Sequence, residues 1–359
     1  MPRKDFTTYL MQWNAQKNTR VMPWKGELDA YKIWISEIIL QQTRVEQGWA
    51  YYERFIQKFP TVQQLAQAND EDIFKLWEGL GYYNRCKNLL FTARLIVTKY
   101  QGIFPNSYDE IINLKGIGTY TASAIASFAF NLPYAVVDGN VFRVLARVFA
   151  IQVPTDTAEG KKIFLELANS LLDKNRPGLY NQAIMDFGAT VCKPFAPACN
   201  MCNINKICKA FENGIVNDLP IKEKIIKKKN RWLYYFIFLK QDTVMVRKRM
   251  QQDIWQNLHE FYLVESTEAI TWDEQEIENI LQNQLHISKY TLLHISPTIE
   301  QQLTHQKIKG QFITIQLTSI PKNIQQYKWH SRNKMDELAF PKFINQYLDK
   351  YFIENKNEM

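Results

Sequence analysis

Residues 114–143 read LKGIGTYTASAIASFAFNLPYAVVDGNVFR, and this stretch decides the fold of the first half of the chain. An apolar residue precedes a Gly-x-Gly turn made by Gly116 and Gly118, and a helix is expected to begin at Thr119. Glycines let the backbone approach another group closely, and the free N–H groups at a helix N-terminus attract anions. The Ala- and Ser-rich run 121–130 predicts a tightly packed helix. The turn therefore suits a phosphate.

The end of this stretch places a single carboxylate, Asp138, between an apolar run and the turn Gly139-Asn140, where a further helix is expected to begin. A phosphate grip followed by a lone carboxylate is what an enzyme acting on one nucleotide of a DNA strand needs. A helix–turn–helix packing unit in which Asp138 is only an N-cap explains the same residues and stays open.

The composition is that of a globular protein with a preference for polyanions. The chain has 359 residues, of which 46% are hydrophobic and 22% charged, which is enough for two domains and excludes a disordered chain. The net charge of +8 favours a partner such as nucleic acid. No apolar run approaches the ~20 residues of a membrane-spanning helix, and the N-terminus does not resemble a signal peptide, so we expect a cytoplasmic protein.

Glu37 is the only charged residue between Ile33 and Thr43, in a region with helical spacing. A carboxyl group in apolar surroundings has a raised pKa, so it can hold a proton near neutral pH and donate it. A place on the solvated stripe of an amphipathic helix is the alternative for Glu37. Further along, residues 79–85 (GLGYYNR) form a loop suited to wedging an aromatic ring into a base stack, or a helix end with packed tyrosines.

Four of the five cysteines follow the pattern Cys192-x6-Cys199-x2-Cys202-x5-Cys208. In a chain without an export signal, this clustering indicates metal binding and argues against disulfides. Zinc and a [4Fe–4S] cluster both accept four thiolates, and the residues leave both possible. The remaining cysteine, Cys86, is expected to be a buried small apolar residue.

The pattern of the chain changes beyond the cysteines. Up to Lys209 strand signals are nearly absent, which predicts an all-α domain over 1–212. Residues 213–230 resemble a linker with a basic run at its end, and an α+β domain is expected over 231–359. Its strands are predicted at 232–239, 243–246, 290–295 and 312–317, and its helices at 272–285 and 341–352.

These tracts occur in the same order in the A/G-specific adenine DNA glycosylases (MutY), of the helix–hairpin–helix superfamily that includes endonuclease III, and the chain resembles that family over nearly its whole length. The tracts are SEIILQQT (36–43), GLGYY (79–83), LKGIG (114–118), VDGNV (137–141) and the four-cysteine loop 192–208. The resemblance implies an all-α helix–hairpin–helix glycosylase domain with a [4Fe–4S] loop, followed by an α+β MutT-like (Nudix-fold) domain.

The resemblance also implies a mechanism. Glu37 matches the catalytic acid that protonates adenine N7, and Asp138 matches the carboxylate that stabilises the oxocarbenium-like sugar, as in other glycosidic cleavages. Asn140 matches a residue that orients this site. Tyr120 stands where lyase relatives carry a Schiff-base lysine, which implies a glycosylase without strand-cutting activity.

Further residues match the family's DNA and base contacts. The implied DNA-binding residues are Gln42, Tyr82, Gly116 and Gly118; the implied adenine pocket wall is Arg20, Trp24 and Gln182; the implied [4Fe–4S] ligands are Cys192, Cys199, Cys202 and Cys208. Leu303-Thr304-His305 resembles the Phe-Ser-His loop that recognises 8-oxoguanine. Residues 255–261 lack the glycines of a Leu-Trp-Gly-Gly tract, which puts the shape of that loop in doubt, and no intact Nudix box is visible, so we expect no pyrophosphatase activity.

The expected function is base excision repair: the protein removes adenine mispaired with 8-oxoguanine or guanine in duplex DNA and leaves an abasic site. We expect it to act as a monomer, in the cytoplasm and in association with the nucleoid. One alternative is an endonuclease III-like glycosylase and lyase for oxidised pyrimidines, against which Tyr120 and the second domain argue. The other is a non-catalytic DNA-binding protein, which gives no reason for Glu37 together with Asp138.

Overall fold

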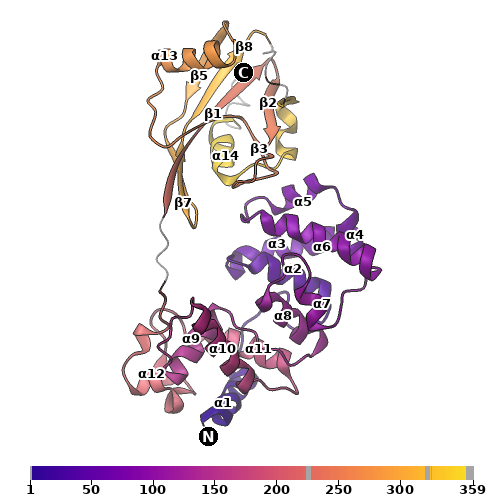
Figure 1. Ribbon diagram of the computed structural model, residues 1–359, viewed down its shortest axis with the longest axis vertical. Helices are drawn as coiled ribbons and strands as arrows, with labels where there is room; N and C mark the ends of the chain where they lie inside the picture. Colours follow the sequence, from indigo (N-terminus) through magenta and orange to yellow (C-terminus); the bar gives the residue numbers. More distant parts are fainter. Residues whose placement is uncertain (1, 224–227, 320–323, 325, 353–359) are drawn as a thin grey trace. The chain divides into compact units, whose positions relative to one another are not determined.

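The computed structural model describes residues 2–223, 228–319, 324 and 326–352, and the chain divides into two compact units (Figure 1). The helical unit comprises Met1–Ala68 and Lys87–Lys224, and the C-terminal unit comprises Asn69–Cys86 and Ile225–Met359. The segment Asn69–Cys86 therefore packs with the second half of the chain, although its position in the sequence predicts it in the first domain.

The helical unit contains no strand among its described residues, as the sequence predicts. Its helices are α1 (Pro2–Lys17), α2 (Ala30–Leu40), α3 (Val45–Lys58), α4 (Val62–Gln67), most of α6 (Asn84–Tyr100), α7 (Tyr108–Ile112), α8 (Thr119–Phe130), α9 (Gly139–Phe149), α10 (Ala158–Leu171), α11 (Pro177–Thr190) and α12 (Lys209–Glu212). Short 3₁₀ turns lie at Cys199–Met201, Asn205–Ile207 and Val216–Asp218.

A shared apolar core places α9 beside α11. Val144 of α9, Phe187 of α11 and Phe6 of α1 are buried in one cluster, because each helix repeats apolar residues on one face. Gly188 allows the close approach of α11 to the start of α9, since a Cβ there would lie 2.7 Å from the Cβ of Asn140. This contact brings the beginning of α9, where Asp138 lies, against α11.

The predicted turn at 114–118 joins α7 to α8 as a hairpin. Gly116 has a φ of +83° and a Cβ there would lie 2.7 Å from the Cβ of Asn88, so both the backbone and the space require glycine. Gly118 is the N-cap of α8, and a Cβ there would meet no atom within 4 Å. The N-terminus of α8 is therefore accessible to an incoming phosphate.

The first part of the predicted linker is held by the helical unit. Arg147 Nε donates to Leu219 O over 3.0 Å, and Thr155 N donates to Ile221 O over 3.0 Å. The basic run predicted at the end of the linker falls partly on 224–227, which lie outside the described residues.

The C-terminal unit is built around strand β1, which confirms the predicted α+β class. Its strands are β1 (Lys229–Lys240), β2 (Thr243–Lys248), β3 (His259–Glu260), β4 (Tyr262–Ser266), β5 (Tyr290–Ile295), β6 (Ile299–Gln302), β7 (Gln306–Gly310), β8 (Phe312–Leu317) and β9 (Lys328–Ser331). β1 pairs antiparallel with β2 and β4 and parallel with β7 and β8. The sequence did not predict β3, β4, β6, β7 and β9. Of these, β6 and β7 form a polar ribbon of Gln, Lys and Glu, residues of low strand propensity.

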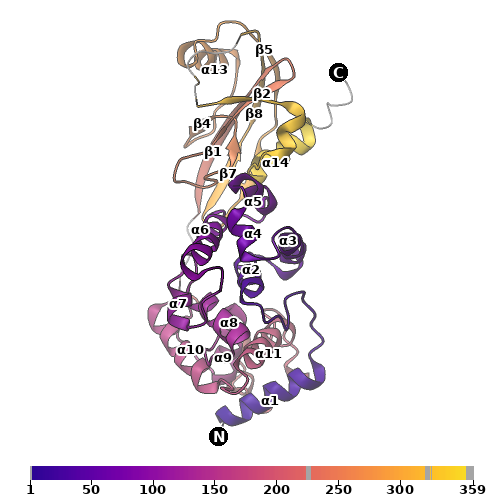
Figure 2. The ribbon, with the colours of Figure 1, turned by 90° about the vertical axis from the view of Figure 1, so that its right-hand side faces the viewer.

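The two faces of this sheet bury alternate residues of β1, and Figure 2 shows helical segments on either side of the sheet. Tyr234, Phe236 and Phe238 pack against α13 (Glu274–Glu278) and the π-helical turns Asn279–Gln284 that continue it. On the other face, Tyr235 lies 6.3 Å from Phe343 of α14 (Lys342–Tyr347), measured between ring centroids. The alternation follows from the two-residue period of a strand.

Helix α5 (Asp70–Trp77) is anchored to the C-terminal half of the chain by Glu78. Its Oε1 accepts hydrogen bonds from Phe340 N and Asn345 Nδ2, both over 2.8 Å. Lys75 Nζ donates to Leu338 O over 3.0 Å. These contacts explain why residues 69–86 belong to the C-terminal unit.

We expect Gly310→Ala to destabilise the C-terminal unit by about 1–3 kcal/mol, because overpacking in a closely packed region costs about that much. A Cβ at this position would lie 1.7 Å from Leu233 O, so β1 and β7 would have to separate. Thermal unfolding measured by circular dichroism checks this. Gly118→Ala, which meets no atom within 4 Å, is the control; equal melting temperatures for the two variants would contradict the prediction.

Candidate active site

A cavity of about 700 Å³ lies on the helical unit between α2, α8, α9 and α11. Glu37, Tyr120, Asp138 and Asn140 all line it, although they come from three different helices and their caps. Pockets that bind small molecules typically measure about 300–1,000 Å³, so this cavity can hold a nucleoside. The two predicted carboxyl groups thus open onto one space.

Glu37 projects from the apolar helix α2 and is 6% exposed. Burial raises its pKa to about 7, and the field of Asp138 adds to that effect. A hydrogen bond from Tyr120 partly opposes the shift, because it stabilises the carboxylate. At neutral pH a large fraction of Glu37 therefore carries a proton that it can donate.

Asp138 is the N-cap of α9, and both of its oxygens are held. Oδ1 accepts from Val141 N over 2.8 Å, and Oδ2 accepts from Asn140 Nδ2 over 2.7 Å. Burial raises the pKa of Asp138, while these hydrogen bonds and the nearby Arg143 act in the opposite direction. The two carboxyl groups thus differ in their hydrogen bonding: Asp138 has partners for its anionic form that Glu37 lacks.

Arg143 connects the Asp138 end of α9 to the cysteine loop. Its NH2 group donates to Asn140 Oδ1 and to Gly188 O, each over 2.8 Å, and its Nε donates to Cys192 O over 2.8 Å. Sequence reasoning did not assign this residue to the site. The available signal was an arginine on the apolar face of α9, three residues after Asn140.

Cys192, Cys199, Cys202 and Cys208 line one small cavity beside α9 and α11. The buried guanidinium of Arg147 lies there too, with NH1 3.6 Å from Cys192 Sγ and 2.7 Å from Lys193 O. Over the described part of the chain, no three Cys, His, Asp or Glu side chains converge as ligands of a metal ion. Four thiols lining one cavity, with a cation beside them, are a donor set that an iron–sulfur cluster accepts.

The three predicted wall residues Arg20, Trp24 and Gln182 line the same cavity as Glu37. Behind them lies a residue that the sequence did not single out, Asp186 of α11, whose side chain accepts hydrogen bonds from both Arg20 and Gln182. Its importance depends on contacts between residues more than 160 positions apart in the chain, which local patterns do not reveal.

The two predicted wedge residues share an uncommon backbone conformation. Gln42, in the turn after α2, has a φ of +58°, and Tyr82, in the turn after α5, has a φ of +49°. Both side chains are exposed, and Tyr82 is 43% exposed. Residues other than glycine adopt positive φ at a cost of roughly 1–2 kcal/mol, and such strain is concentrated at functional sites.

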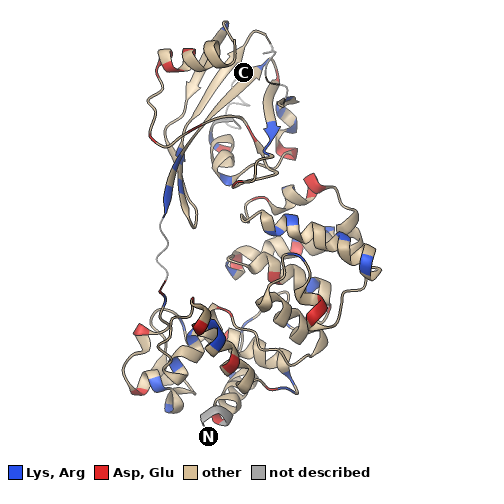
Figure 3. Ribbon diagram, in the orientation of Figure 1, with Lys and Arg blue, Asp and Glu red and all other residues tan. Residues whose placement is uncertain are grey.

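A second cavity, of about 470 Å³, lies within the C-terminal unit. It is lined by residues of 79–85, 253–256 and 301–306 together with Lys342. Tyr82 Oη and Thr304 Oγ1 form a hydrogen bond there, and Leu303 N donates to Gln306 O over 2.8 Å to close the turn that presents Thr304 and His305. Lys307 and Lys309 of β7 follow this turn, and Glu300 of β6 pairs with both, over 2.7 and 3.1 Å. Figure 3 shows how lysines and arginines are distributed along the chain.

The tract 255–261 keeps a tight loop without the glycines of the family pattern. Trp255 and Asn257 adopt positive φ values of 64° and 70°. Arg249 N donates to Leu258 O and Asn257 N donates to Arg249 O, each over 2.8 Å, so the loop is closed by backbone bonds. Asparagine tolerates this conformation better than most residues, which explains one of the two replacements.

Comparison with known proteins agrees with this architecture. Residues 35–169 match the model of the HhH-GPD superfamily base excision DNA repair proteins, and residues 234–350 match that of the NUDIX domain. The chain is 33% identical to the adenine DNA glycosylase of Buchnera aphidicola subsp. Baizongia pistaciae over 351 residues, 96% of each chain. The chain belongs to the adenine DNA glycosylase family. The human adenine DNA glycosylase is 43% identical over 215 residues, which cover 57% of this chain and 39% of the human protein.

Solved structures agree for the helical part of this adenine DNA glycosylase family member. A thermostable thymine-DNA glycosylase matches with a TM-score of 0.55 and 30% identity, covering 59% of this chain and 97% of that one. A non-covalent endonuclease III–DNA complex matches with a TM-score of 0.51 at 21% identity and shows the same fold.

Membership of the family confirms the expectation of a DNA glycosylase that acts in base excision repair, with DNA as its partner. The expected helix–hairpin–helix and Nudix architecture is confirmed as well. None of the described helices has both the length and the apolar character required to cross a bilayer.

We expect Arg143→Gln to lower both base release and the iron content of the protein, by about tenfold for base release. The substitution frees Asn140 and leaves Gly188 O and Cys192 O without the guanidinium donor. Single-turnover base release and iron per chain are the measurements. Arg176→Gln, at a 60% exposed arginine paired with Asp173, is the control and should change neither; an Arg143 variant with normal iron and rate would contradict the link.

Proposed function

We propose that this glycosylase removes adenine paired with 8-oxoguanine or guanine in duplex DNA, hydrolysing the N-glycosidic bond and leaving an abasic site. The observation that carries the proposal is that Glu37 and Asp138 line one cavity of nucleoside size. A flipped adenosine between them has its base near an acid and its sugar near an anion.

Glu37 is the proton donor in this proposal. Adenine is a poor leaving group until it is protonated, and N7 is the site that a carboxylic acid can reach on the edge of a flipped base. A pKa of about 7 suits this role, because general acids are most effective when their pKa lies near the working pH. After the base has left, the Glu37 carboxylate can orient the attacking water and take its proton.

Asp138 stabilises the cationic sugar that forms as the bond breaks. Its two oxygens are fixed by Val141 N and Asn140, so the anion does not have to reorganise during the reaction. Tyr120 completes the site by its hydrogen bond to Glu37. Because Tyr120 has no amine, no Schiff base forms there and the strand is not cut.

DNA contacts follow from the turns already described. The N-terminus of α8 behind Gly116 and Gly118 binds a backbone phosphate, and Gln42 and Tyr82 enter the base stack where the nucleotide leaves it. The Leu303-Thr304-His305 turn, hydrogen-bonded to Tyr82, contacts the base opposite the adenine. Thr304 supplies the hydroxyl group of the family pattern, whereas Leu303 lacks its aromatic face.

The four cysteines hold a [4Fe–4S] cluster in this proposal. The cavity beside α9 and α11 is lined by four thiols, those of Cys192, Cys199, Cys202 and Cys208. The buried Arg147 offsets part of the negative charge of four thiolates. When bound, such a cluster cross-links the loop 192–208 and can also exchange an electron. Arg143 then joins a fixed loop to Asn140 and Asp138.

The test of the proposal is Glu37→Gln. We expect base release from an A:8-oxoguanine duplex to fall by roughly 10²–10⁴-fold under single-turnover conditions, because the acid is lost while the shape is kept. Glu46→Gln, at an exposed glutamate of the neighbouring helix α3, is the matched control and should be as active as wild type. Unchanged release in Glu37→Gln would refute the mechanism.

The pH dependence should follow the same residue. The pKa of Glu37 is raised from 4.5 to about 7 in the folded protein, so the protonated form, and with it base release, declines as the pH rises above 7. Between pH 4.5 and about 7 the folded state binds a proton that the unfolded state has lost, so the free energy of unfolding falls as the pH rises through this range. Glu37→Gln should remove that dependence.

Borohydride reduces a Schiff base to a stable covalent adduct, so it should trap no adduct between this protein and DNA. A trapped adduct would favour the lyase alternative.

We expect Thr304→Val to reduce the preference for 8-oxoguanine over guanine opposite adenine by about tenfold, because one hydrogen-bonded contact to a base is worth about 1–3 kcal/mol. The measurement is the ratio of single-turnover rates on the two duplexes. Thr318→Val, at an exposed threonine after β8, should leave the ratio unchanged. If both variants keep the wild-type ratio, the turn at 303–305 does not contact the opposite base.

A further inference from the structure

Asp186 is a fully buried carboxylate behind the active-site cavity, with a side-chain exposure of 0%. It lies one turn after Gln182 on α11. Four donors surround it, each at 2.9 Å: Arg20 NH1 and Gln182 Nε2 on Oδ1, and Lys25 Nζ and Asn18 Nδ2 on Oδ2. The mechanism above does not use this carboxylate.

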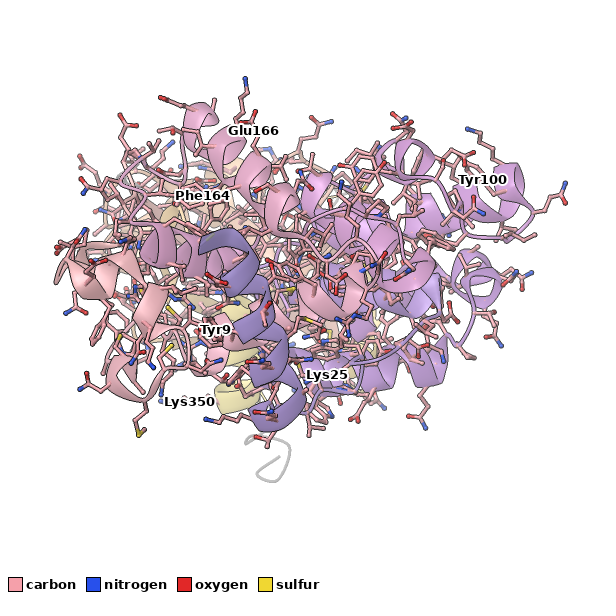
Figure 4. The ribbon with its side chains drawn as sticks, turned by 90° about the horizontal axis from the view of Figure 1, so that it is seen from below. Tyr9, Lys25, Tyr100, Phe164, Glu166 and Lys350 are labelled. Carbon is pink, nitrogen blue, oxygen red and sulfur yellow. The ribbon has the colours of Figure 1, made fainter. Side chains whose placement is uncertain are left out.

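The same contacts fix the segment between α1 and α2. Lys25 Nζ also donates to Arg20 O over 2.8 Å, and Arg20 N donates to Asn18 Oδ1 over 3.1 Å. Figure 4 shows Lys25 beside α1, which carries Tyr9. Two cations and one carboxylate thus hold this segment against α11, so Asp186 is fixed in place by groups on a second element.

A carboxylate can only accept hydrogen bonds, and this determines how the amide of Gln182 is oriented. The NH2 group of Gln182 must face Asp186 Oδ1, because the amide oxygen would be repelled there. Gln182 lines the cavity, and because its nitrogen faces Asp186, its carbonyl oxygen is the acceptor that the amide offers to a bound base. A carbonyl oxygen accepts from an amino group and repels another carbonyl.

We propose that Asp186 is a positioning residue that fixes the Gln182 amide and thereby makes the cavity select a purine with an amino group at C6 over one with a carbonyl at C6. Adenine presents an N6 donor, whereas guanine and hypoxanthine present an O6 acceptor. The inference rests on the proposed function, since it concerns the base that enters the same cavity. A buried hydrogen-bonding group left unpaired by the wrong base makes such discrimination strong.

The experiment compares single-turnover base release from duplexes with 2′-deoxyadenosine or 2′-deoxyinosine opposite 8-oxoguanine. Asp186→Asn keeps the volume of the side chain but adds an NH2 group, so the Gln182 amide can turn its oxygen away from the cavity. We expect the adenine-to-hypoxanthine rate ratio to fall by about tenfold or more. Gln182→Leu should lower the ratio similarly, and the double variant should be no less selective than Gln182→Leu, because both changes act through one amide.

Asn18→Ala is the matched control. The substitution removes one donor from the same carboxylate and the acceptor of Arg20 N. Asn18 does not line the cavity, so the variant should keep the ratio within about twofold. A general loosening of the segment would instead move the ratio in this variant as well, and that result would overturn the inference.

The outcomes separate the inference from the proposed function. A wild-type protein that releases no adenine refutes the proposed function itself. If wild type releases adenine and Asp186→Asn slows both substrates equally, Asp186 is only an anchor and the inference is wrong. Circular dichroism shows whether Asp186→Asn folds. If this variant does not fold, an unchanged rate ratio in Gln182→Leu overturns the inference. A lowered ratio in Gln182→Leu, together with a wild-type ratio in Asn18→Ala, supports the inference.

Discussion

Two buried carboxyl groups line one cavity, and their desolvation is the constraint on which the chemistry of the helical unit depends. Taking either group out of water disfavours its anion, and the charge of Asp138 further raises the pKa of Glu37. The protein meets these costs differently at the two positions. Asp138 accepts two close hydrogen bonds at the start of α9, which stabilise its anion. Glu37 lies in an apolar helix and has a pKa of about 7, so much of it stays protonated up to that pH. The environment alone gives two similar side chains different chemistry.

Helix α9 links this cavity to the cysteine loop. Its first turn holds Asp138, Arg143 one turn later contacts both Asn140 and Cys192 O, and Arg147 contacts the loop at Cys192 and Lys193. The arginines are buried, and their donors are satisfied mainly by backbone carbonyls of residues far away in sequence. A few directional contacts therefore connect the loop to the residue that holds Asp138.

The C-terminal unit includes a segment, Asn69–Cys86, from the first half of the sequence. Residues 69–86 follow the first helices in sequence but are bound through Glu78 to Phe340 and Asn345. Tyr82, proposed to enter the base stack, is hydrogen-bonded to Thr304, proposed to contact the opposite base. One short segment thus joins the two features of this unit that are proposed to contact DNA, because Phe340 and Asn345 hold it in position.

The sequence alone determined the family, the change from helices to an α+β domain, the glycine turn at 114–118 and the raised pKa of Glu37, because these depend on local spacing and on the polarity of near neighbours. The strands β6 and β7 were missed, since polar ribbons lack the usual strand pattern. Only the tertiary structure decided that Glu37 and Asp138 line one cavity and that Arg143 bridges Asn140 and Cys192. It also decided that Asp186 accepts hydrogen bonds from Arg20, Lys25 and Gln182. Those contacts join residues distant in the chain, and the packing of helices sets them.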